Sequence, residues 1–178
     1  EIVDEVVDRL SIRYNIDLDK KEIIKRINKF LDVNHKIIYT EIMDAFFDYS
    51  TKRWGEKTLL QWSIIPKYLE YFPNGQVIHI IRDPRKVLSS YKTMTNESGD
   101  RYLDAIFACM HSMDSALRLL DELPENRYYM LNFDDFTNNK NENSEKLCKF
   151  LNIDFNPQML NPENFINIMG NKWKHNTA

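Results

Sequence analysis

The chain has 178 residues, of which 24 are lysine or arginine and 27 are aspartate or glutamate, so its formal net charge is −3. With 43% apolar and 29% charged residues it falls in the globular range, and its length predicts one domain over residues 1–178. No run of about 18 apolar residues exists, which excludes a bilayer-spanning helix. The mildly acidic balance argues against a nucleic-acid partner.

Two cysteines, Cys109 and Cys148, each lie inside an apolar helical pattern. Their number and setting argue against a disulfide scaffold and against a zinc site, so a cytoplasmic location is expected. The four glycines are too widely spaced to form a glycine-rich phosphate loop. A phosphate site in this chain must therefore use other residues.

The first fifty residues repeat apolar side chains at helical spacing three times. This pattern predicts amphipathic helices over about residues 2–10, 23–31 and 42–49. Asp19 is the predicted N-cap of the second helix and Thr40 that of the third. A short polar turn then follows.

Helical spacing at Ile65, Leu69 and Phe72 predicts the next helix, which residues 73–75 end. The β-branched run at residues 76–82 has the length of a strand. A turn precedes it and a proline follows it, as expected of a central strand buried on both faces. This is the clearest strand in the sequence.

Asp83 and Pro84 predict a helix start directly after that strand, with Asp83 as N-cap. A loop is expected at residues 96–100, a long helix over 103–120 and a second strand at 128–133. The apolar positions of the long helix, expected to face inward, are Leu103, Ile106, Phe107, Met110, Leu117 and Leu120.

A polar loop at residues 138–143 and a helix over 143–151 complete the pattern. The order strand, helix, strand, helix favours an α/β fold with a parallel sheet and helices on its faces.

Arg82 and Ser90 are the first candidate site residues. Arg82 ends the predicted strand where a helix begins, and ligands of open α/β sheets bind beyond the carboxyl ends of strands, near helix N-termini that favour anions. Ser90 lies seven residues after Asp83, about two helical turns, so it can face the same side and share one phosphate. The alternative is a charged strand end and helix cap without a ligand.

Lys57 and Glu56 are neighbours in the polar turn at residues 54–58. A lysine ammonium is suited to stabilise a transferring, oxygen-rich group. The alternative is a solvated ion pair between the two side chains. His79, inside the predicted buried strand, is interpreted as a core histidine.

Taken together, several segments resemble the sulfotransferase superfamily, especially its bacterial members. They are residues 53–58 with the Glu56-Lys57-Thr58 turn, Phe72-Pro73, the run 78–87 with Ser90, and residues 132–136 with 145–151. The likeness covers roughly residues 50–160. It implies a three-layer α/β fold like that of P-loop nucleotide kinases, here with a helix-rich N-terminal region.

The resemblance implies transfer of a sulfuryl group from 3′-phosphoadenosine 5′-phosphosulfate to a hydroxyl or amine of an acceptor, without a metal. By position, it assigns Arg82 and Ser90 to the 3′-phosphate and Lys57 to the transferring group. Phe133 matches an aromatic residue that contacts adenine in some members, or else is a core aromatic. Lys172 matches a second phosphate contact, or else belongs to a frayed basic tail.

The family's first strand and its phosphosulfate-binding loop have no counterpart in this sequence. We therefore expect an N-terminally truncated chain that is inactive by itself. The general base is open, because Leu59 stands where some members have a histidine. Glu56 is the local candidate, and its competing role is to position Lys57.

Two other interpretations differ in class. The N-terminal helices could form a non-catalytic, partner-binding module beside a vestigial nucleotide site. A phosphoryl-transferring kinase is disfavoured because no lysine-containing phosphate loop is present. The acceptor and the oligomeric state are not specified by the sequence.

Overall fold

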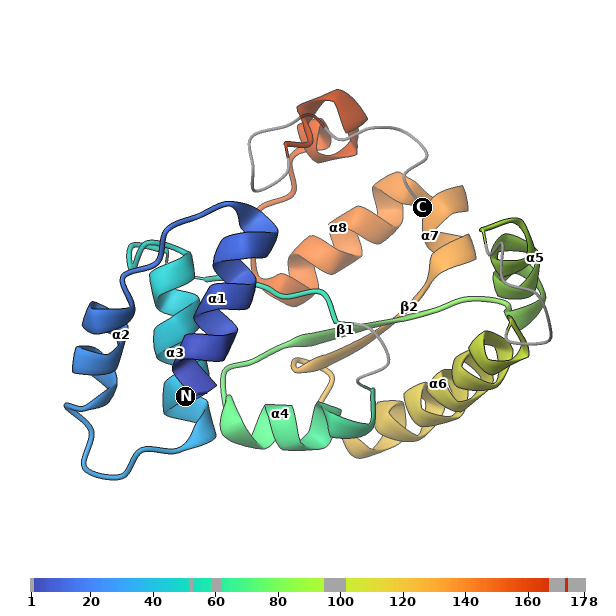
Figure 1. Cartoon of the computed structure of the whole chain (residues 1–178). Coiled ribbons are helices and arrows are strands. Elements are labelled where there is room, and N and C mark those ends of the chain that lie inside the picture. Colours follow the sequence, from blue (N-terminus) through green and yellow to red (C-terminus); the bar gives the residue numbers. More distant parts are fainter. Residues whose placement is uncertain (1, 52, 59–61, 95–101, 167–171, 173–178) are drawn as a thin grey trace. The chain divides into compact units, whose positions relative to one another are not determined.

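The computed structural model describes residues 2–51, 53–58, 62–94, 102–166 and 172 (Figure 1). The chain divides into two compact units. We call Glu1–Lys57 with Pro162–Ala178 the helical unit, and Thr58–Asn161 the sheet unit. The single domain expected over residues 1–178 stays a prediction.

The helical unit contains the three helices that the sequence predicts, α1 (Ile2–Tyr14), α2 (Lys20–Ile27) and α3 (His35–Phe46). Their apolar faces pack together because amphipathic helices of this length are stabilised mainly by tertiary packing. The buried residues of this core are Val7, Ile23, Ile27 and Ile42.

The N-caps of α2 and α3 test two predictions. Asp19 caps α2 as predicted, and its Oδ1 accepts a hydrogen bond of 3.0 Å from the backbone N–H of Glu22. The prediction of Thr40 as a cap is wrong, because α3 begins five residues earlier. There, Asn34 Oδ1 accepts a hydrogen bond of 3.1 Å from the Ile37 N–H. Asparagine is at least as good an N-cap as threonine.

The sheet unit alternates helices and strands. Its elements are η1 (Trp62–Ile64), α4 (Ile65–Tyr71), β1 (Val77–Ile81), α5 (Pro84–Met94), α6 (Tyr102–Glu122), β2 (Tyr128–Asn132), α7 (Phe133–Asn138), α8 (Lys140–Leu151) and η2 (Pro157–Leu160). Figure 1 shows the two strands between α4 and α6 on one side and α8 on the other.

β1 and β2 pair in parallel, with Val77 opposite Tyr128 and Ile81 opposite Asn132. The connection between them runs through α5 and α6, as parallel strands require a long crossover. The predicted α/β class with a parallel sheet is thus confirmed. Its kinase-like detail and the missing first strand stay predictions.

One face of β1 is less buried than predicted. His79 and Ile81 are 7% and 9% exposed, but Ile80 between them is 57% exposed. On the opposite face of the sheet from α6, Phe150 of α8 packs against Tyr129 of β2. The β-branched run therefore predicted the strand correctly, and burial on both faces was wrong.

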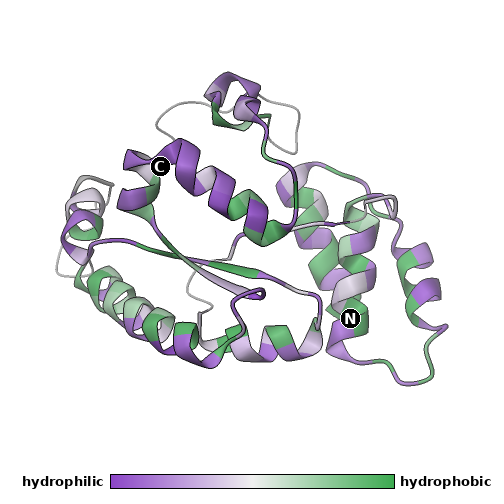
Figure 2. Cartoon of the chain, turned by 180° about the vertical axis from the view of Figure 1, so that it is seen from behind, coloured by the Kyte–Doolittle hydropathy of each residue, from purple (hydrophilic) through white to green (hydrophobic). Residues whose placement is uncertain are grey.

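Helix α6 forms as predicted, but the face that it buries is different. Five residues expected to face inward are 37–58% exposed: Leu103, Phe107, Met110, Leu117 and Leu120. The helix instead buries Ala116 and Leu119 completely, and Leu119 joins the core of the sheet unit. Hydrophobic residues recur along the length of α6 (Figure 2), so spacing alone did not identify the buried side.

The predicted polar loop at residues 138–143 is wrong, because Asn139 alone separates α7 from α8. Asn143 lies within α8, is 5% exposed, and donates hydrogen bonds of 3.1 Å to the backbone oxygens of Asp135 and Asn139. These bonds join the two helices, and Asn143 is the one buried residue of this polar segment. The loop predicted at 96–100 lies outside the described residues.

Leu119→Ala should lower the free energy of unfolding by about 2–5 kcal/mol, because it removes a fully buried side chain from a packed core. Leu117→Ala, on the same helix at 56% exposure, should change it by less than about 0.5 kcal/mol. Urea unfolding measures both. Equal losses in the two variants would contradict the observed orientation of α6.

Candidate functional site

The carboxyl ends of β1 and β2 lie side by side, because Ile81 pairs with Asn132. Arg82 therefore follows one strand where Phe133 and Asp134 follow the other, and α5 and α7 both begin at this edge. Ligands of open α/β sheets bind at such edges. We call Arg82, Lys86, Phe133 and Asp134 the strand-end cluster.

Arg82 stacks on an aromatic ring and carries an unsatisfied donor. Its Cζ atom lies 4.7 Å from the centroid of the Phe133 ring, a cation–π contact. Its Nε is buried and has no hydrogen-bond acceptor among the described residues. Asp134 Oδ1 lies 3.8 Å from this Nε, beyond hydrogen-bond length. A buried donor without an acceptor costs free energy, which an oxygen from a ligand would recover.

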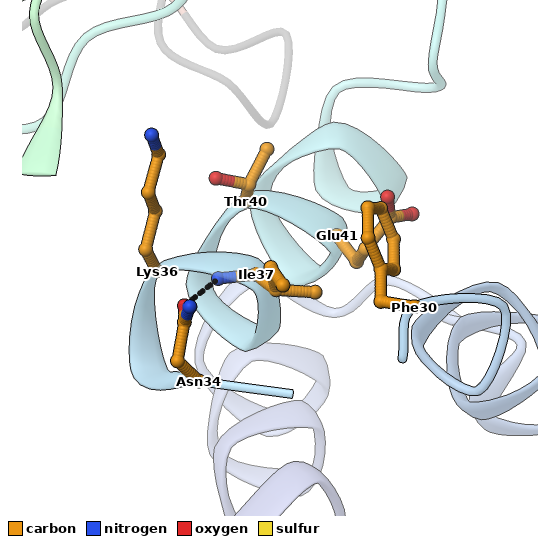
Figure 3. Close-up of a pocket in the computed structure, with 6 residues that line it drawn as sticks. All are labelled: Phe30, Asn34, Lys36, Ile37, Thr40 and Glu41. Carbon is orange, nitrogen blue, oxygen red and sulfur yellow. Dashed lines mark hydrogen bonds between the residues drawn. The ribbon is translucent and has the colours of Figure 1, made fainter. Parts of the chain in front are cut away.

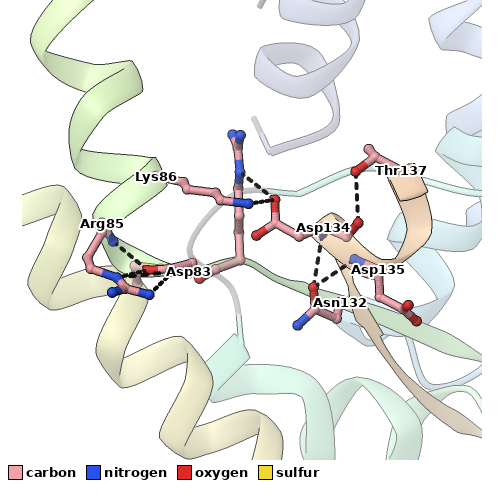
Figure 4. Close-up of polar contacts among 9 residues, drawn as sticks. Asp83, Arg85, Lys86, Asn132, Asp134, Asp135 and Thr137 are labelled. Carbon is pink, nitrogen blue, oxygen red and sulfur yellow. Dashed lines mark hydrogen bonds and ion pairs between the residues drawn. The ribbon is translucent and has the colours of Figure 1, made fainter. Parts of the chain in front are cut away.

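Lys86 and Asp134 form the shortest ion pair of the cluster, with 3.0 Å between Lys86 Nζ and Asp134 Oδ1 (Figure 4). Asp134 is anchored at its own backbone. Its N–H donates to Asn132 Oδ1 at 2.9 Å, and its carbonyl oxygen accepts a hydrogen bond of 2.9 Å from Thr137 Oγ1. The carboxylate is therefore presented from a fixed first turn of α7.

Asp83 caps α5, as predicted, and is bound to Arg85. Its carboxylate accepts hydrogen bonds from the Arg85 backbone N–H at 2.9 Å and from Arg85 Nη2 at 2.6 Å (Figure 4). Hydrogen bonds from the Arg85 side chain, followed by that from its backbone, lower the pKa of Asp83 to about 2. This carboxylate stays charged and paired with Arg85.

Ser90 lies in α5 and is half-buried, two turns after the start of the helix. Phe133 opens α7 and is 37% exposed, which favours a surface contact over a buried core position. The predicted roles of both residues toward a nucleotide stay predictions.

Glu56 and Lys57 lie in the helical unit and are both exposed. The Tyr39 hydroxyl donates a hydrogen bond to the Glu56 carboxylate. Tyr39 also packs edge-on against Trp54, whose Nε1 donates to Asp44 Oδ1 at 3.3 Å, so the turn is fastened to α3. Within the described turn no ion pair joins Glu56 to Lys57. Their predicted catalytic roles remain untested.

Lys172 forms an isolated antiparallel bridge with Ile166 and is exposed. Its neighbours on both sides lie outside the described residues. Its predicted contact with a phosphate stays a prediction.

The helical unit also has a pocket of about 330 Å³, which the sequence did not predict (Figure 3). Its lining residues are Phe30, Asn34, Lys36, Ile37, Thr40 and Glu41. Glu41 is 7% exposed, and its Oε2 accepts a hydrogen bond of 2.7 Å from Arg26 Nε. Arg26 also lies 4.2 Å from the centroid of the Tyr49 ring. The Glu41 carboxylate is therefore paired with Arg26 and joins α3 to α2.

His79 is a core histidine, as interpreted from the sequence. Its Nδ1 lies 2.7 Å from the Tyr128 hydroxyl and its Nε2 lies 2.8 Å from Ser112 Oγ. Burial lowers the pKa of His79 and raises the pKa of Tyr128 to about 12. This network joins the middle of β1 to the start of β2 and to α6.

Both cysteines, Cys109 and Cys148, are free thiols. Among the described residues, no group of three or more histidine, cysteine, aspartate or glutamate side chains could hold a metal ion. The helices of the described ranges include none that is both long and apolar enough to cross a membrane.

Lys86 and Asp134 are the cluster members that sequence reasoning did not single out. Two signals could have found them. Asp134 directly follows the strand predicted at residues 128–133, and Lys86 lies four residues after Arg82, in the first turn of α5.

Comparison with known proteins adds a family and a fold. A family model described as "Sulfotransferase family" matches residues 12–157. A solved structure titled "Sulfotransferase Domain from the Curacin Biosynthetic Pathway" is similar, with a TM-score of 0.57 and 20% sequence identity. The match covers 86% of this chain and 57% of that one, so this chain spans little more than half of that structure. No curated protein sequence matches the chain.

The lowered pKa of His79 predicts a pH-dependent stability. The pKa of His79 in the folded chain lies below the unfolded value of about 6.5. The stability that neutral His79 contributes is therefore complete above about pH 6.5 and is lost as the pH falls from there through the folded pKa. The urea concentration at the midpoint of unfolding should decrease when the pH is lowered from about 7.5 to about 5.5. In His79→Gln this fall should be smaller, whereas exposed His111→Gln should retain it. An unchanged fall in His79→Gln would contradict this assignment.

Proposed function

Because the chain belongs to the sulfotransferase family, we propose that it takes part in transfer of a sulfuryl group to a hydroxyl or amine of an acceptor. The proposed donor is 3′-phosphoadenosine 5′-phosphosulfate, which supplies a sulfuryl group activated by its bond to a phosphate. The acceptor is assigned no chemical class beyond its hydroxyl or amine group. The family resemblance implies no metal.

Arg82 of the strand-end cluster is the proposed contact for the 3′-phosphate of the nucleotide. The observation that supports this is the buried Nε of Arg82, which lacks an acceptor within the described chain and lies where β1 meets α5. A phosphate oxygen would supply that acceptor and form a charge-assisted hydrogen bond. Ser90 is the proposed second contact, and the exposed part of Phe133 is proposed to contact adenine.

The remaining proposed roles belong to the helical unit. Lys57 is proposed to stabilise the negative charge that develops on the leaving oxygen, for which an exposed ammonium is suited. Lys172 is proposed as a further phosphate contact. Glu56 is the proposed base or a positioning residue, and its hydrogen bond from Tyr39 supports positioning.

Arg82→Ala should weaken binding of adenosine 3′,5′-bisphosphate by at least about tenfold, because a hydrogen bond to a charged group contributes about 1.5–3 kcal/mol. Calorimetric titration measures this affinity. The matched control is Arg118→Ala, which removes an arginine that is 56% exposed and paired with Glu122 on α6. The control should bind within about twofold of the unmodified chain.

Circular dichroism should show that both variants are folded. Absence of nucleotide binding by the unmodified chain would contradict the proposed function. Equal affinities of Arg82→Ala and the unmodified chain would instead contradict the placement of the phosphate at Arg82.

A further inference from the structure

We propose that Lys86 is a positioning residue that holds the Asp134 carboxylate away from Arg82 and so keeps Arg82 available to an anionic ligand. The identity of that ligand, the nucleotide 3′-phosphate, rests on the proposed function. The arrangement of the three side chains does not depend on it.

The argument starts from one shared oxygen. Asp134 Oδ1 lies 3.0 Å from Lys86 Nζ and 3.8 Å from Arg82 Nε. Charge-assisted N–H···O hydrogen bonds measure about 2.7–2.9 Å, so the arginine contact is roughly 1 Å too long to be one. The carboxylate is hydrogen-bonded to the lysine and only near the arginine.

Asp134 has limited freedom to form ion pairs with both Lys86 and Arg82. Its backbone N–H is held by Asn132 Oδ1 and its carbonyl oxygen by Thr137, both at 2.9 Å. Its side chain is 23% exposed, so water neutralises its charge only in part. If the lysine ammonium were removed, a small rotation toward Arg82 would restore a cationic partner. That rotation would also satisfy the buried Nε of Arg82 and leave less for an external anion.

The second carboxylate beside Arg82 is held in the same manner. Asp83 follows Arg82 in the chain, and Arg85 binds it through both Nε, at 3.0 Å, and Nη2, at 2.6 Å. Each acidic neighbour of Arg82 thus has a separate cation as its partner. The aromatic face of Phe133 supports the guanidinium without using its donors.

A double-mutant cycle tests the inference by calorimetric titration with adenosine 3′,5′-bisphosphate. Lys86→Gln should weaken binding about tenfold, because Asp134 then pairs with Arg82. Asp134→Asn alone should change the affinity less than about twofold, since that carboxylate is already neutralised by Lys86. The double variant should return to within about twofold of the unmodified chain, a non-additive rescue.

The matched control is Lys146→Gln on α8. Lys146 is 55% exposed and lies 2.7 Å from Glu142, whereas Lys86 is 54% exposed and equally ion-paired. The control loses the same charge and should bind normally.

Two outcomes would overturn the inference. If Lys86 contacted the anion directly, the double variant would remain as weak as Lys86→Gln. If Lys86 acted only through long-range charge, Asp134→Asn would strengthen binding equally in both backgrounds, and added salt would remove the effect of Lys86→Gln.

A measurement without ligand separates this inference from the proposed function. The Arg82 Nε–H resonance, observed by NMR in the free chain, should exchange more slowly with water in Lys86→Gln and should lose this protection in the double variant. An unchanged resonance would overturn the inference even if the nucleotide binds. Failure of the unmodified chain to bind nucleotide would contradict the proposed function, while the resonance would still report on Lys86.

Discussion

The parallel pairing of β1 with β2 is the constraint on which the strand-end cluster depends. With Ile81 opposite Asn132, the residues that follow the two strands become neighbours although about fifty positions separate them in sequence. A register shift by one residue would turn each side chain to the other face and separate Arg82 from Phe133. The cluster therefore exists only in this register.

Polar contacts at the start of β2 hold the register of the strands. Near their start, Arg127 donates to the backbone oxygens of Leu69 at 2.8 Å and Phe72 at 2.6 Å, which ties the end of α4 to the start of β2. Further along, His79 of β1 meets Tyr128 of β2 at 2.7 Å. A slipped register would leave these groups without partners. Burying polar groups without partners costs free energy, so the observed register is favoured. The stability of the core and the geometry of the cluster thus share one cause.

The cluster also illustrates how acidic residues can surround an anion site. Asp83 and Asp134 lie beside Arg82, and the carboxylate of either could form an ion pair with its guanidinium. Arg85 and Lys86, in the first turn of α5, each bind one of them. The charge of the carboxylates is thereby compensated locally, and the group left without a hydrogen-bond acceptor among the described residues is the buried Nε of Arg82. A site with an unsatisfied donor is prepared for an acceptor that comes from outside the chain.

The sequence predicted where helices and strands occur better than it predicted which of their faces are buried. Strand β1 and the place of Arg82 directly after it were predictable because a β-branched run between a turn and a proline has few other interpretations. The exposure of Ile80 and the orientation of α6 were not, because they depend on which element covers which side. Helix α7 was missed because six polar and aromatic residues show no clear periodicity, although Asn132 caps it. Sequence position marks Lys86 and Asp134 as residues near the strand ends, but the contact between them depends on the strand register.

A crystal structure of the chain with adenosine 3′,5′-bisphosphate would test the central claim most directly. The account predicts a 3′-phosphate oxygen within hydrogen-bond distance of Arg82 Nε, with Asp134 still paired to Lys86. A nucleotide bound elsewhere, with Arg82 Nε still lacking an acceptor or paired with Asp134, would contradict it.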